Sequence, residues 1–322
     1  MQNLKRIAVL TSGGDSPGMN AAIRAVTRTA IYSDLEVVGV QRGYEGLLEG
    51  DFIPLEKGSV GSIIHRGGTF LRTARSERFR TEEGQKEALA RLEDAAVDAL
   101  VVIGGEGSYK GAWELHKKGL PVIGLPGTID NDIAGTDETI GFDTAVNTAL
   151  EAVQKLRDTA SSHDRLFIVE VMGRHTGFLA LEVGVASGAE VAIVPENPFS
   201  LGRIVDKLHY SRKRGKTHSM IILAEGVMPA QSLKEALMDT GGYEARVTVL
   251  GHVLRGGSPT SFDTVLASRM GVAAVQALLE GERGVMVGVR CGQMKLSPLP
   301  VAWEEKKCLN PELISLIDIL SI

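Results

Sequence analysis

The sequence is poor in cysteine and in aromatic residues. Its 322 residues include only two cysteines, Cys291 and Cys308, and they do not form a CxxC motif. Such an isolated pair fits free thiols in a reducing compartment better than a disulfide framework. Aromatic residues make up 5% of the chain, which argues against a stacking platform for single-stranded nucleic acid.

An excess of positive charge and long apolar runs are also missing. The formal net charge is −5, so no overall basic field would attract nucleic acid. The N-terminal segment MQNLKRIAVLTSGGD lacks the long apolar stretch of a signal peptide. No apolar run approaches the length that spans a membrane. We therefore expect a cytoplasmic protein with neither a nucleic-acid nor a membrane partner.

The sequence does contain many glycines and many short apolar runs. Its 38 glycines indicate backbone that turns tightly or approaches a ligand closely. Continuous runs rich in Val, Ile and Leu alternate with helical patterns, which predicts an α/β protein with helices on both faces of a mainly parallel sheet. The longest helical pattern, residues 142–162, is a candidate crossing between two lobes, although composition marks no boundary.

The predicted strands end in chemically unusual segments. Six of these exits combine Gly with Asp, Glu, Arg or His: SGGDSPG, GGEGSYKG, PGTIDND, MGRHTG, AEG and GHVLRGG. Ligands of open parallel sheets bind outside the carboxyl ends of the strands. The first two exits are strand, Gly turn and helix units whose N–H groups suit a phosphate, although the glycines equally suit tight packing. Neither is a Walker A loop or a clean dinucleotide fingerprint.

The segment LPGTIDND places Asp130 and Asp132 two residues apart directly after an apolar run. Pro, Gly, Asp and Asn are the usual residues of a turn. A catalytic loop would have the same composition, with one carboxylate taking a proton and the other holding a cation or orienting a group. The segment alone leaves both interpretations open.

Several cations lie in or beside the predicted loops. Arginine suits bidentate recognition of phosphate, but a solvated surface position explains any one of these side chains as well. They are Arg75, Arg165, Arg174, Arg246 and Arg255, together with His252. The basic segment HYSRKRGKTH, residues 209–218, fits a solvated helix end. Its GKT is not a P-loop, since Tyr210 occupies the position of the first Gly and the segment follows a helix.

Taken together, the motifs resemble one family, the bacterial ATP-dependent 6-phosphofructokinases. LTSGGDSPGMNAAIR, IGGEGSY, PGTIDNDI, VMGRHTG, RVTVLGHVLRGGSPT and DTVLASRMG match in order, from about residue 6 to the C-terminus. The resemblance implies two Rossmann-like α/β/α sandwich domains with mainly parallel sheets, assembled as a homotetramer. It further implies transfer of the ATP γ-phosphoryl group to the 1-hydroxyl of fructose 6-phosphate, with Mg²⁺, giving fructose 1,6-bisphosphate in glycolysis.

The same resemblance implies a domain division and a catalytic apparatus. The larger, ATP-binding domain would comprise 1–141 and about 259–307, and the smaller, sugar-phosphate domain 142–258 and about 308–322. Asp130 matches the general base and Thr128 a contact to the transferring phosphoryl group. Arg75 and Arg174 complete the catalytic set. Glu106 and Asp132 match the positions associated with Mg²⁺.

Three further groups of residues follow from the resemblance. The ATP contacts are Gly14, Tyr44, Arg75, Ser76, Phe79, Gly105, Glu106, Gly107 and Ser108. The sugar-phosphate contacts are Thr128, Ile129, Asp130, Met172, Gly173, Arg174, Glu225, His252 and Arg255, with Arg165 and Arg246 reaching in from a neighbouring subunit. The effector site for ADP or phosphoenolpyruvate comprises Arg24, Arg28, Arg157, Gly188, Glu190, Arg214, Lys216 and His218.

Three positions depart from the family pattern. Glu106 replaces the usual Asp of the GGDGS motif, Ser62 a usual Asp, and Thr217 a frequent Lys. Glu106 leaves open a regulatory paralogue with little activity. A pyrophosphate-dependent enzyme is the other alternative, but such enzymes carry Asp and Lys where this chain has Gly107 and Gly127. A nicotinamide oxidoreductase has no fingerprint in the sequence.

Overall fold

The computed structural model describes residues 4–161 and 165–321. The chain divides into two compact units. Unit 1 runs to Thr144 and also includes Arg255–Lys307. Unit 2 contains Ala145–Leu254 and the residues from Cys308 onward. The division expected from the sequence lies at 141/142 and about 258/259. The assignment of ATP to one unit and sugar phosphate to the other stays a prediction.

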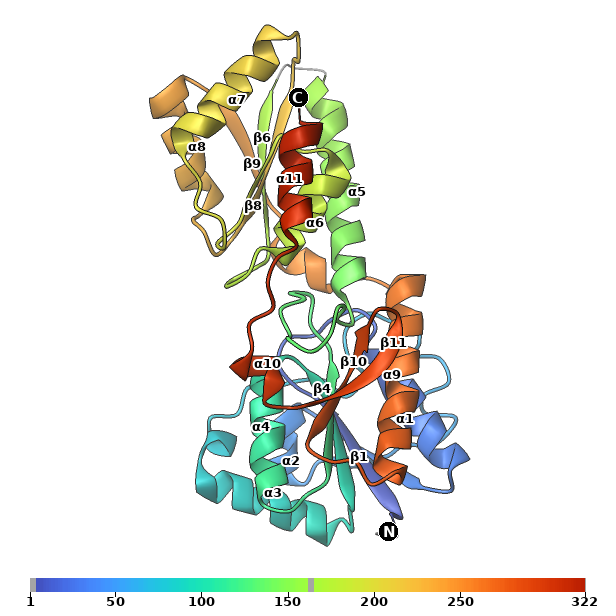
Figure 1. Cartoon of the computed structure of the whole chain (residues 1–322). Coiled ribbons are helices and arrows are strands. Elements are labelled where there is room, and N and C mark those ends of the chain that lie inside the picture. The colour runs from blue at the N-terminus through green and yellow to red at the C-terminus, as the bar shows by residue number, and fades with distance from the viewer. Residues whose placement is uncertain (1–3, 162–164, 322) are drawn as a thin grey trace. The chain divides into compact units, whose positions relative to one another are not determined.

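Unit 1 is built on a seven-stranded sheet with the order β11-β10-β5-β4-β1-β2-β3 (Figure 1). The inner strands pair in parallel, and only the edge strands β3 and β11 are antiparallel to their neighbours. The strands are β1 (Arg6–Thr11), β2 (Glu36–Val40), β3 (Phe52–Pro54), β4 (Ala99–Gly104), β5 (Val122–Pro126), β10 (Val285–Arg290) and β11 (Gln293–Pro298). Strands β1, β4 and β5 are buried almost throughout, as continuous apolar runs predict.

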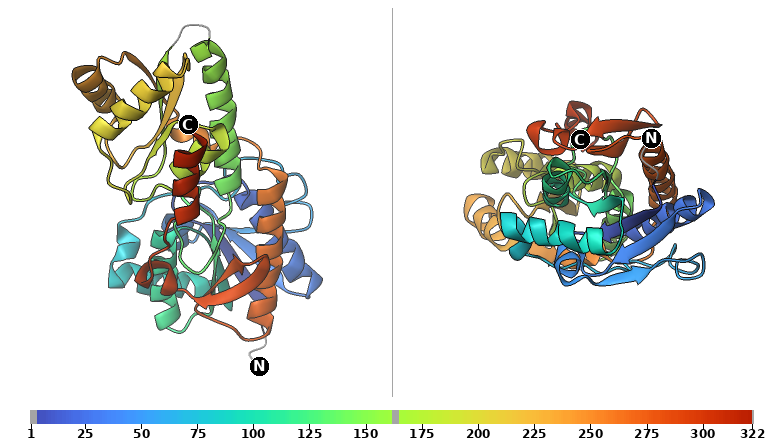
Figure 2. Two further views of the ribbon diagram at one scale, coloured as in Figure 1. Left: turned by 45° about the horizontal axis from the view of Figure 1, so that its top comes forward. Right: turned by 90° about the horizontal axis from the view of Figure 1, so that it is seen from below.

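Helices cover both faces of this sheet (Figures 1 and 2). Alternate side chains of β1 enter two separate cores, with Ile7 and Val9 in one and Ala8 and Leu10 in the other. The first core contains α1 (Met19–Tyr32) and α9 (Ser261–Leu279), and the second α2 (Gly43–Glu49), α3 (Glu82–Asp94) and α4 (Glu106–Lys117). The short helices η1 (Arg78–Arg80), η2 (Gly251–Arg255) and α10 (Val301–Glu304) lie in connections.

Helix α9 is long and apolar enough, by length and composition, to cross a membrane, whereas the sequence analysis found no apolar run that approaches this length. Half of its most apolar window is buried inside the protein. A Cβ on Gly271 would lie 2.6 Å from the Cβ of Ala25, so α9 packs closely on α1. These contacts are those of a core helix.

The strand order creates a switch point between β1 and β4. The chain leaves β1 for β2 on one side, whereas β4 pairs with β1 on the other side. The backbone N–H of Ser12 donates to the carbonyl of Ile103 at 3.0 Å, so the two strand exits lie next to each other. Crevices at such points bind ligands in this class of fold. The SGGD and GGEG turns therefore border one predicted binding site.

Unit 2 contains a four-stranded parallel sheet with the order β7-β8-β6-β9. Its strands are β6 (Leu166–Val171), β7 (Val191–Ile193), β8 (Ser219–Ala224) and β9 (Ala245–Val249). Helices α7 (Leu201–Lys213) and α8 (Ala230–Gly241) form a core with one face, and α6 (Phe178–Ser187) and α11 (Pro311–Leu320) lie on the other (Figure 1). Helix α5 spans Phe142–Ser161, and residue 162 of its predicted extent lies outside the described residues. The predicted α/β architecture with mainly parallel sheets is confirmed.

Asp263 fixes the start of helix α5 within unit 1. This carboxylate is fully buried and accepts hydrogen bonds from the N–H of Gly141 at 2.8 Å, and from the N–H and hydroxyl of Thr144 at 2.8 and 2.5 Å. Burial raises the pKa of Asp263, and these hydrogen bonds oppose that effect. These three hydrogen bonds thus replace the hydration that the buried Asp263 carboxylate has lost.

We expect Asp263→Ala to lower the free energy of unfolding by about 2–4 kcal/mol, because it leaves buried donors without an acceptor. Urea denaturation followed by circular dichroism measures this change. Asp94→Ala, which removes an exposed carboxylate at the end of α3, is the matched control and should stay within about 0.5 kcal/mol. Equal stability of the two variants would contradict the role given to Asp263.

Candidate active site

A cavity of about 920 Å³ opens at the carboxyl ends of β1, β4 and β5 in unit 1. Most of its predicted lining residues belong to the two Gly turns and to the TIDND loop. The cavity brings together Gly14, Tyr44, Arg75, Ser76, Phe79, Gly105, Glu106, Gly107, Ser108, Thr128, Ile129, Asp130, Asp132 and Arg255. All predicted ATP contacts and both acidic residues of the loop thus share one cavity.

The two Gly turns pack against each other so closely that larger residues would not fit. A Cβ on Gly104 would lie 2.5 Å from the hydroxyl oxygen of Ser108 and from the carbonyl oxygen of Ser12. The carbonyl of Gly13 accepts a hydrogen bond from the hydroxyl of Thr73 at 2.6 Å. Helix α4 begins at Glu106 directly after the second turn, and its N-terminal N–H groups favour an anion. The geometry suits a phosphate chain.

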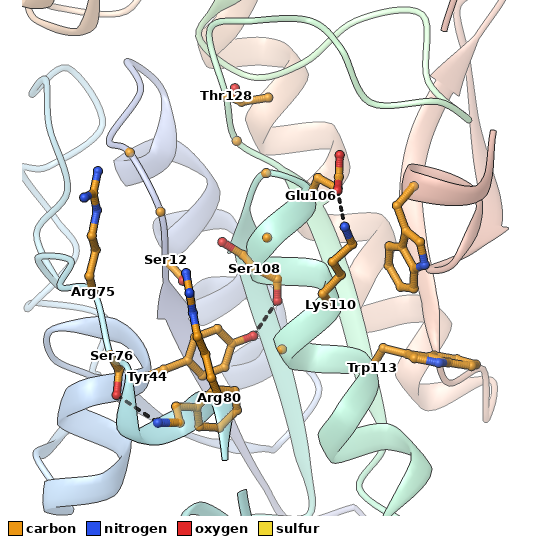
Figure 3. A pocket seen from close by; sticks show the side chains of 18 of the residues that line it. Ser12, Tyr44, Arg75, Ser76, Arg80, Glu106, Ser108, Lys110, Trp113 and Thr128 are labelled. Carbon is orange, nitrogen blue, oxygen red and sulfur yellow. Dashed lines mark hydrogen bonds and ion pairs between the residues drawn. The ribbon is translucent and has the colours of Figure 1, made fainter. Parts of the chain in front are cut away.

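Two stacked aromatic rings form the wall behind the second Gly turn. The rings of Tyr44 and Phe79 lie 4.0 Å apart with an interplanar angle of 13°. The Tyr44 hydroxyl donates to the carbonyl of Ser108 at 2.5 Å, and burial raises the pKa of this tyrosine (Figure 3). Ser76 accepts from the N–H of Phe79 at 3.2 Å. A flat apolar wall beside a phosphate-binding turn fits the base or sugar of a nucleotide.

The TIDND segment is a turn, and it also presents two carboxylates to the cavity. The backbone N–H of Asp130 donates to the Thr128 hydroxyl at 3.2 Å. Asn131 has a left-handed φ of 51°, a conformation that Asn adopts more readily than most residues. The side chains on either side of it, Asp130 and Asp132, line the cavity. The two interpretations of this segment are therefore compatible.

Glu106 is engaged by a residue of its own helix. The ammonium of Lys110, one turn further along α4, forms an ion pair with the Glu106 carboxylate (Figure 3). The same ammonium lies 5.9 Å from the ring centroid of Trp303. Both members of the pair are about half exposed at the cavity. A cation that approaches Glu106 has to compete with Lys110.

No group of three or more His, Cys, Asp or Glu side chains gathers as a metal site within residues 4–161 and 165–321. Mg²⁺ in kinases is held by one or two carboxylates and by substrate phosphates rather than by a complete protein cage. Glu106 and Asp132 offer two carboxylates at one cavity. The donor chemistry therefore fits an Mg²⁺ that arrives with a nucleotide.

Arg255 contributes to the cavity from a distant part of the sequence. A Cβ on Gly14 would lie 2.4 Å from a guanidinium nitrogen of Arg255, so any larger residue at position 14 would displace this guanidinium. The sequence analysis placed Arg255 among the sugar-phosphate contacts and Gly14 among the ATP contacts. In the structure the two residues touch.

Unit 2 carries most of the remaining predicted sugar-phosphate residues at one end of its sheet. Glu225 follows β8, and its N–H donates to the carbonyl of Val171 at 3.0 Å. The N–H of Gly226 donates to the carbonyl of Gly173 at 3.2 Å, so the MGR and AEG segments lie side by side. Met172, Arg174 and, after β9, His252 also follow carboxyl ends of strands.

Arg165 and Arg246 lie at the opposite end of that sheet. Arg165 directly precedes β6, Arg246 is the second residue of β9, and the register pairs Leu166 with Ala245. Arg246 is half exposed and forms a 3.2 Å ion pair with Glu244. The chain therefore does not bring these two arginines to the strand ends that carry Arg174.

The predicted effector residues fall into two groups. In unit 2, Arg157 donates to the carbonyl of Ser187 at 2.5 Å and to that of Gly188 at 3.3 Å. Lys216 forms an ion pair with the buried Glu190. Arg214 ends helix α7, and the buried Nδ1 of His218 has no hydrogen-bond partner among the described residues.

Arg24 and Arg28 form the second effector group, on helix α1 of unit 1. Burial, followed by the nearby charge of Arg28, lowers the pKa of Arg24. The buried Nε of Arg24 likewise has no hydrogen-bond partner within the part of the chain that the structure describes. Two adjacent cations of this kind suit an anionic ligand.

The sequence analysis missed a second wall of the cavity. Lys110, Trp113 and Lys117 repeat on the face of α4 that begins with Glu106, and helical spacing would have identified them. Trp303 and Glu304 come from α10, far along the chain, and Arg80 and Gln85 come from η1 and α3. No sequence signal joins these distant segments to the Gly turns.

Comparison with known proteins agrees with this geometry. The family model described as Phosphofructokinase matches residues 6–278. An ATP-dependent 6-phosphofructokinase of Listeria welshimeri is 57% identical over 319 residues, covering 99% of this chain and 100% of the relative. ATP-dependent 6-phosphofructokinase 1 of Thermus thermophilus is 54% identical over 322 residues, with coverage of 99% and 100%.

A solved structure supports the same conclusion. The phosphofructokinase of Saccharomyces cerevisiae is 38% identical and superposes with a TM-score of 0.88, covering 99% of this chain and 48% of the yeast chain. This chain thus corresponds to about half of the yeast polypeptide. By the family match and by full-length identity to bacterial relatives, the chain belongs to the phosphofructokinase family.

Proposed function

We propose that the chain acts as an ATP-dependent 6-phosphofructokinase of glycolysis, phosphorylating the 1-hydroxyl of fructose 6-phosphate. The observation that carries this conclusion is the 57% identity over the full length of the Listeria enzyme of that name. A coupled assay with fructose 6-phosphate and ATP, GTP or pyrophosphate tests it. We expect turnover with ATP. An enzyme that uses pyrophosphate but not ATP would contradict the proposed function.

In the mechanism that we propose, the chain positions the reactants and moves one proton. The sugar hydroxyl oxygen forms a bond to the γ-phosphorus as the bond to the β,γ-bridging oxygen breaks, which releases ADP. The carboxylate of Asp130 accepts the hydroxyl proton. Thr128 and Arg75 face the transferring group, where a guanidinium stabilises charge on phosphoryl oxygens. Arg174 is assigned to the sugar phosphate.

The proposed ATP site uses the cavity of unit 1. The Gly14 and Gly105–Ser108 turns would hold the phosphates, and the stacked Tyr44 and Phe79 the nucleoside. Glu106 and Asp132 are the residues that would hold Mg²⁺, directly or through water. When bound, Mg²⁺ would neutralise charge on the β- and γ-phosphates.

We expect Glu106→Asp to raise the apparent affinity for Mg²⁺ several-fold. The shorter side chain reaches Lys110 less well, so Mg²⁺ meets a weaker competitor for the carboxylate. Titration calorimetry of Mg²⁺ with the nucleotide-bound protein measures the affinity, and kcat at saturating substrates is recorded beside it. Lys110→Met should shift the affinity in the same direction. If both variants and Glu106→Ala match the unmodified protein, Glu106 has no role at the metal.

We propose a homotetramer in which Arg165 and Arg246 complete the sugar-phosphate site of a neighbouring subunit. Their placement at the amino ends of β6 and β9 supports a role outside their own chain's site. Helix α9 also exposes a row of apolar side chains that suits a subunit contact. They are Phe262, Val265, Val272 and Leu279, which are 37–57% exposed. A cytoplasmic location completes the proposal.

We expect ADP or phosphoenolpyruvate to shift the half-saturating concentration of fructose 6-phosphate about fivefold or more, a normal size for allosteric coupling. Lys216→Met should abolish most of the shift, because it removes a cation from the predicted effector site. Lys295→Met, which removes an exposed lysine of β11, is the control. Ser62 and Thr217 alter the family's pattern at this site. Flat responses to both effectors over a wide concentration range would refute effector binding.

A further inference from the structure

Lys307 reaches across the loop that contains the predicted base. Its ammonium donates to the side-chain oxygen of Asn131 at 2.9 Å and to the backbone carbonyl of Asp137 at 2.7 Å. Lys307 belongs to none of the predicted sites and is the last residue of unit 1 before the chain enters unit 2. It therefore joins two points of the loop that are six residues apart.

The first anchoring point is adjacent to Asp130. Asn131 is buried, with 6% of its surface exposed, and its φ is 51°. Its side chain is turned to Lys307, whereas the neighbouring Asp130 and Asp132 line the cavity. A shift of the Asn131 side chain would rotate the peptide that carries Asp130.

The second anchoring point is held by two further hydrogen bonds. The N–H of Asp137 donates to the carbonyl of Val289 at 2.8 Å, and its carboxylate accepts from the N–H of Cys291, also at 2.8 Å. Asp137 is thereby fixed to the β10–β11 hairpin. Because the Lys307 ammonium binds both the Asp137 carbonyl and the Asn131 side chain, it restrains Asn131 relative to this hairpin.

The two ends of the loop are also tied to each other. Gly127 forms a bridge with Ile140, and the hydroxyl of Thr139 donates to the carbonyl of Thr128 at 2.7 Å. Lys307 adds a connection between the Asn131 turn and Asp137, near the second of these ends. Burial in the loop lowers the pKa of Lys307 to about 8, and the nearby carboxylates of Glu138, Asp137 and Asp132 oppose this shift.

We propose that Lys307 is a positioning residue, which holds the Asn131 turn so that Asp130 presents its carboxylate to the sugar hydroxyl. The proposal rests on the proposed role of Asp130 as the base. Lys307 does not touch a substrate in this scheme and acts only through the loop. Its loss should therefore reduce the rate of phosphoryl transfer and leave ATP binding intact.

The test compares Lys307→Met with Lys295→Met, an exposed lysine of unit 1. We expect Lys307→Met to lower kcat by roughly 10-fold to 10²-fold, since a misplacement of about 1 Å can cost about 10²-fold. The KM for ATP should stay within about threefold. Asn131→Gly, which keeps the left-handed backbone and removes the acceptor, should lower kcat in the same way. It also provides the test if Lys307→Met does not fold.

A double variant separates positioning from a general loss of structure. In an Asp130→Ser protein the group that Lys307 positions is missing, so adding Lys307→Met should lower kcat no further. A further drop of tenfold, or a rise in the KM for ATP parallel to the loss of kcat, would overturn the proposal. So would a kcat within twofold of the unmodified protein in both Lys307→Met and Asn131→Gly. Asp130→Ser by itself reports separately on the base, because near-normal kcat there refutes the proposed function of Asp130.

Discussion

Asp130→Ser is expected to lower kcat by roughly 10²–10⁴, the usual contribution of a positioned general base. The hydroxyl of serine is too weak a base to take the proton of the sugar hydroxyl at neutral pH. Asp130 lines the cavity of unit 1 beside Thr128, whose hydroxyl accepts from the Asp130 backbone N–H at 3.2 Å. That backbone contact does not involve the carboxylate and can persist in the variant.

Steady-state kinetics at saturating ATP measure this effect. The KM for fructose 6-phosphate should stay within a few-fold, because the lost interaction acts on the proton in the transition state rather than on the bound sugar. Asp94→Ser, at an exposed position of α3, is the control and should retain full kcat. An Asp130→Ser enzyme with near-normal kcat would remove Asp130 from the mechanism.

The long buried elements could be predicted from the sequence, because burial on both faces leaves a continuous apolar run. Strands β1, β4, β5, β6 and β8 all coincide with such runs. The short and exposed elements could not. Strand β3 has three residues and α10 four, and β11 is a largely exposed edge strand with the sequence QMKLSP. Their positions depend on packing against distant segments rather than on a local pattern.

The site residues also differ in whether a local sequence motif could identify them. The Gly turns and the TIDND loop follow apolar runs, and the strand order then brings their predicted residues to one cavity. Trp303 and Lys307 lie far along the chain and have no motif, so only the fold connects them to that cavity and to its loop. Contacts of Arg255 with Gly14 likewise depend on tertiary structure.

In the proposed function, the choice of phosphoryl donor depends on space at Gly107 and Gly127. At Gly127 a Cβ would lie 3.0 Å from side-chain carbons of both Ile103 and Met19, so a side chain at this position would crowd two core residues. At Gly107 a Cβ would have no atom within 4 Å. Packing therefore does not explain Gly107, which agrees with the proposal that this space is occupied by the nucleotide. Gly107 is the position where the choice between ATP and pyrophosphate is tested without disturbing the core.

Gly107→Asp is expected to lower kcat/KM for ATP by about 10²-fold or more. Its carboxylate would occupy the place proposed for the α-phosphate, where like charges cost several kcal/mol and each 1.4 kcal/mol is a factor of ten. The fold should tolerate the change, since Gly107 is the second residue of α4 and an acidic side chain is favourable in the first turn of a helix. Gly107→Asn adds nearly the same volume without charge, so it should retain more ATP activity than Gly107→Asp. Steady-state kinetics with varied ATP compare the two variants, and ATP kinetics that remain unchanged in Gly107→Asp would mean that Gly107 does not face the nucleotide.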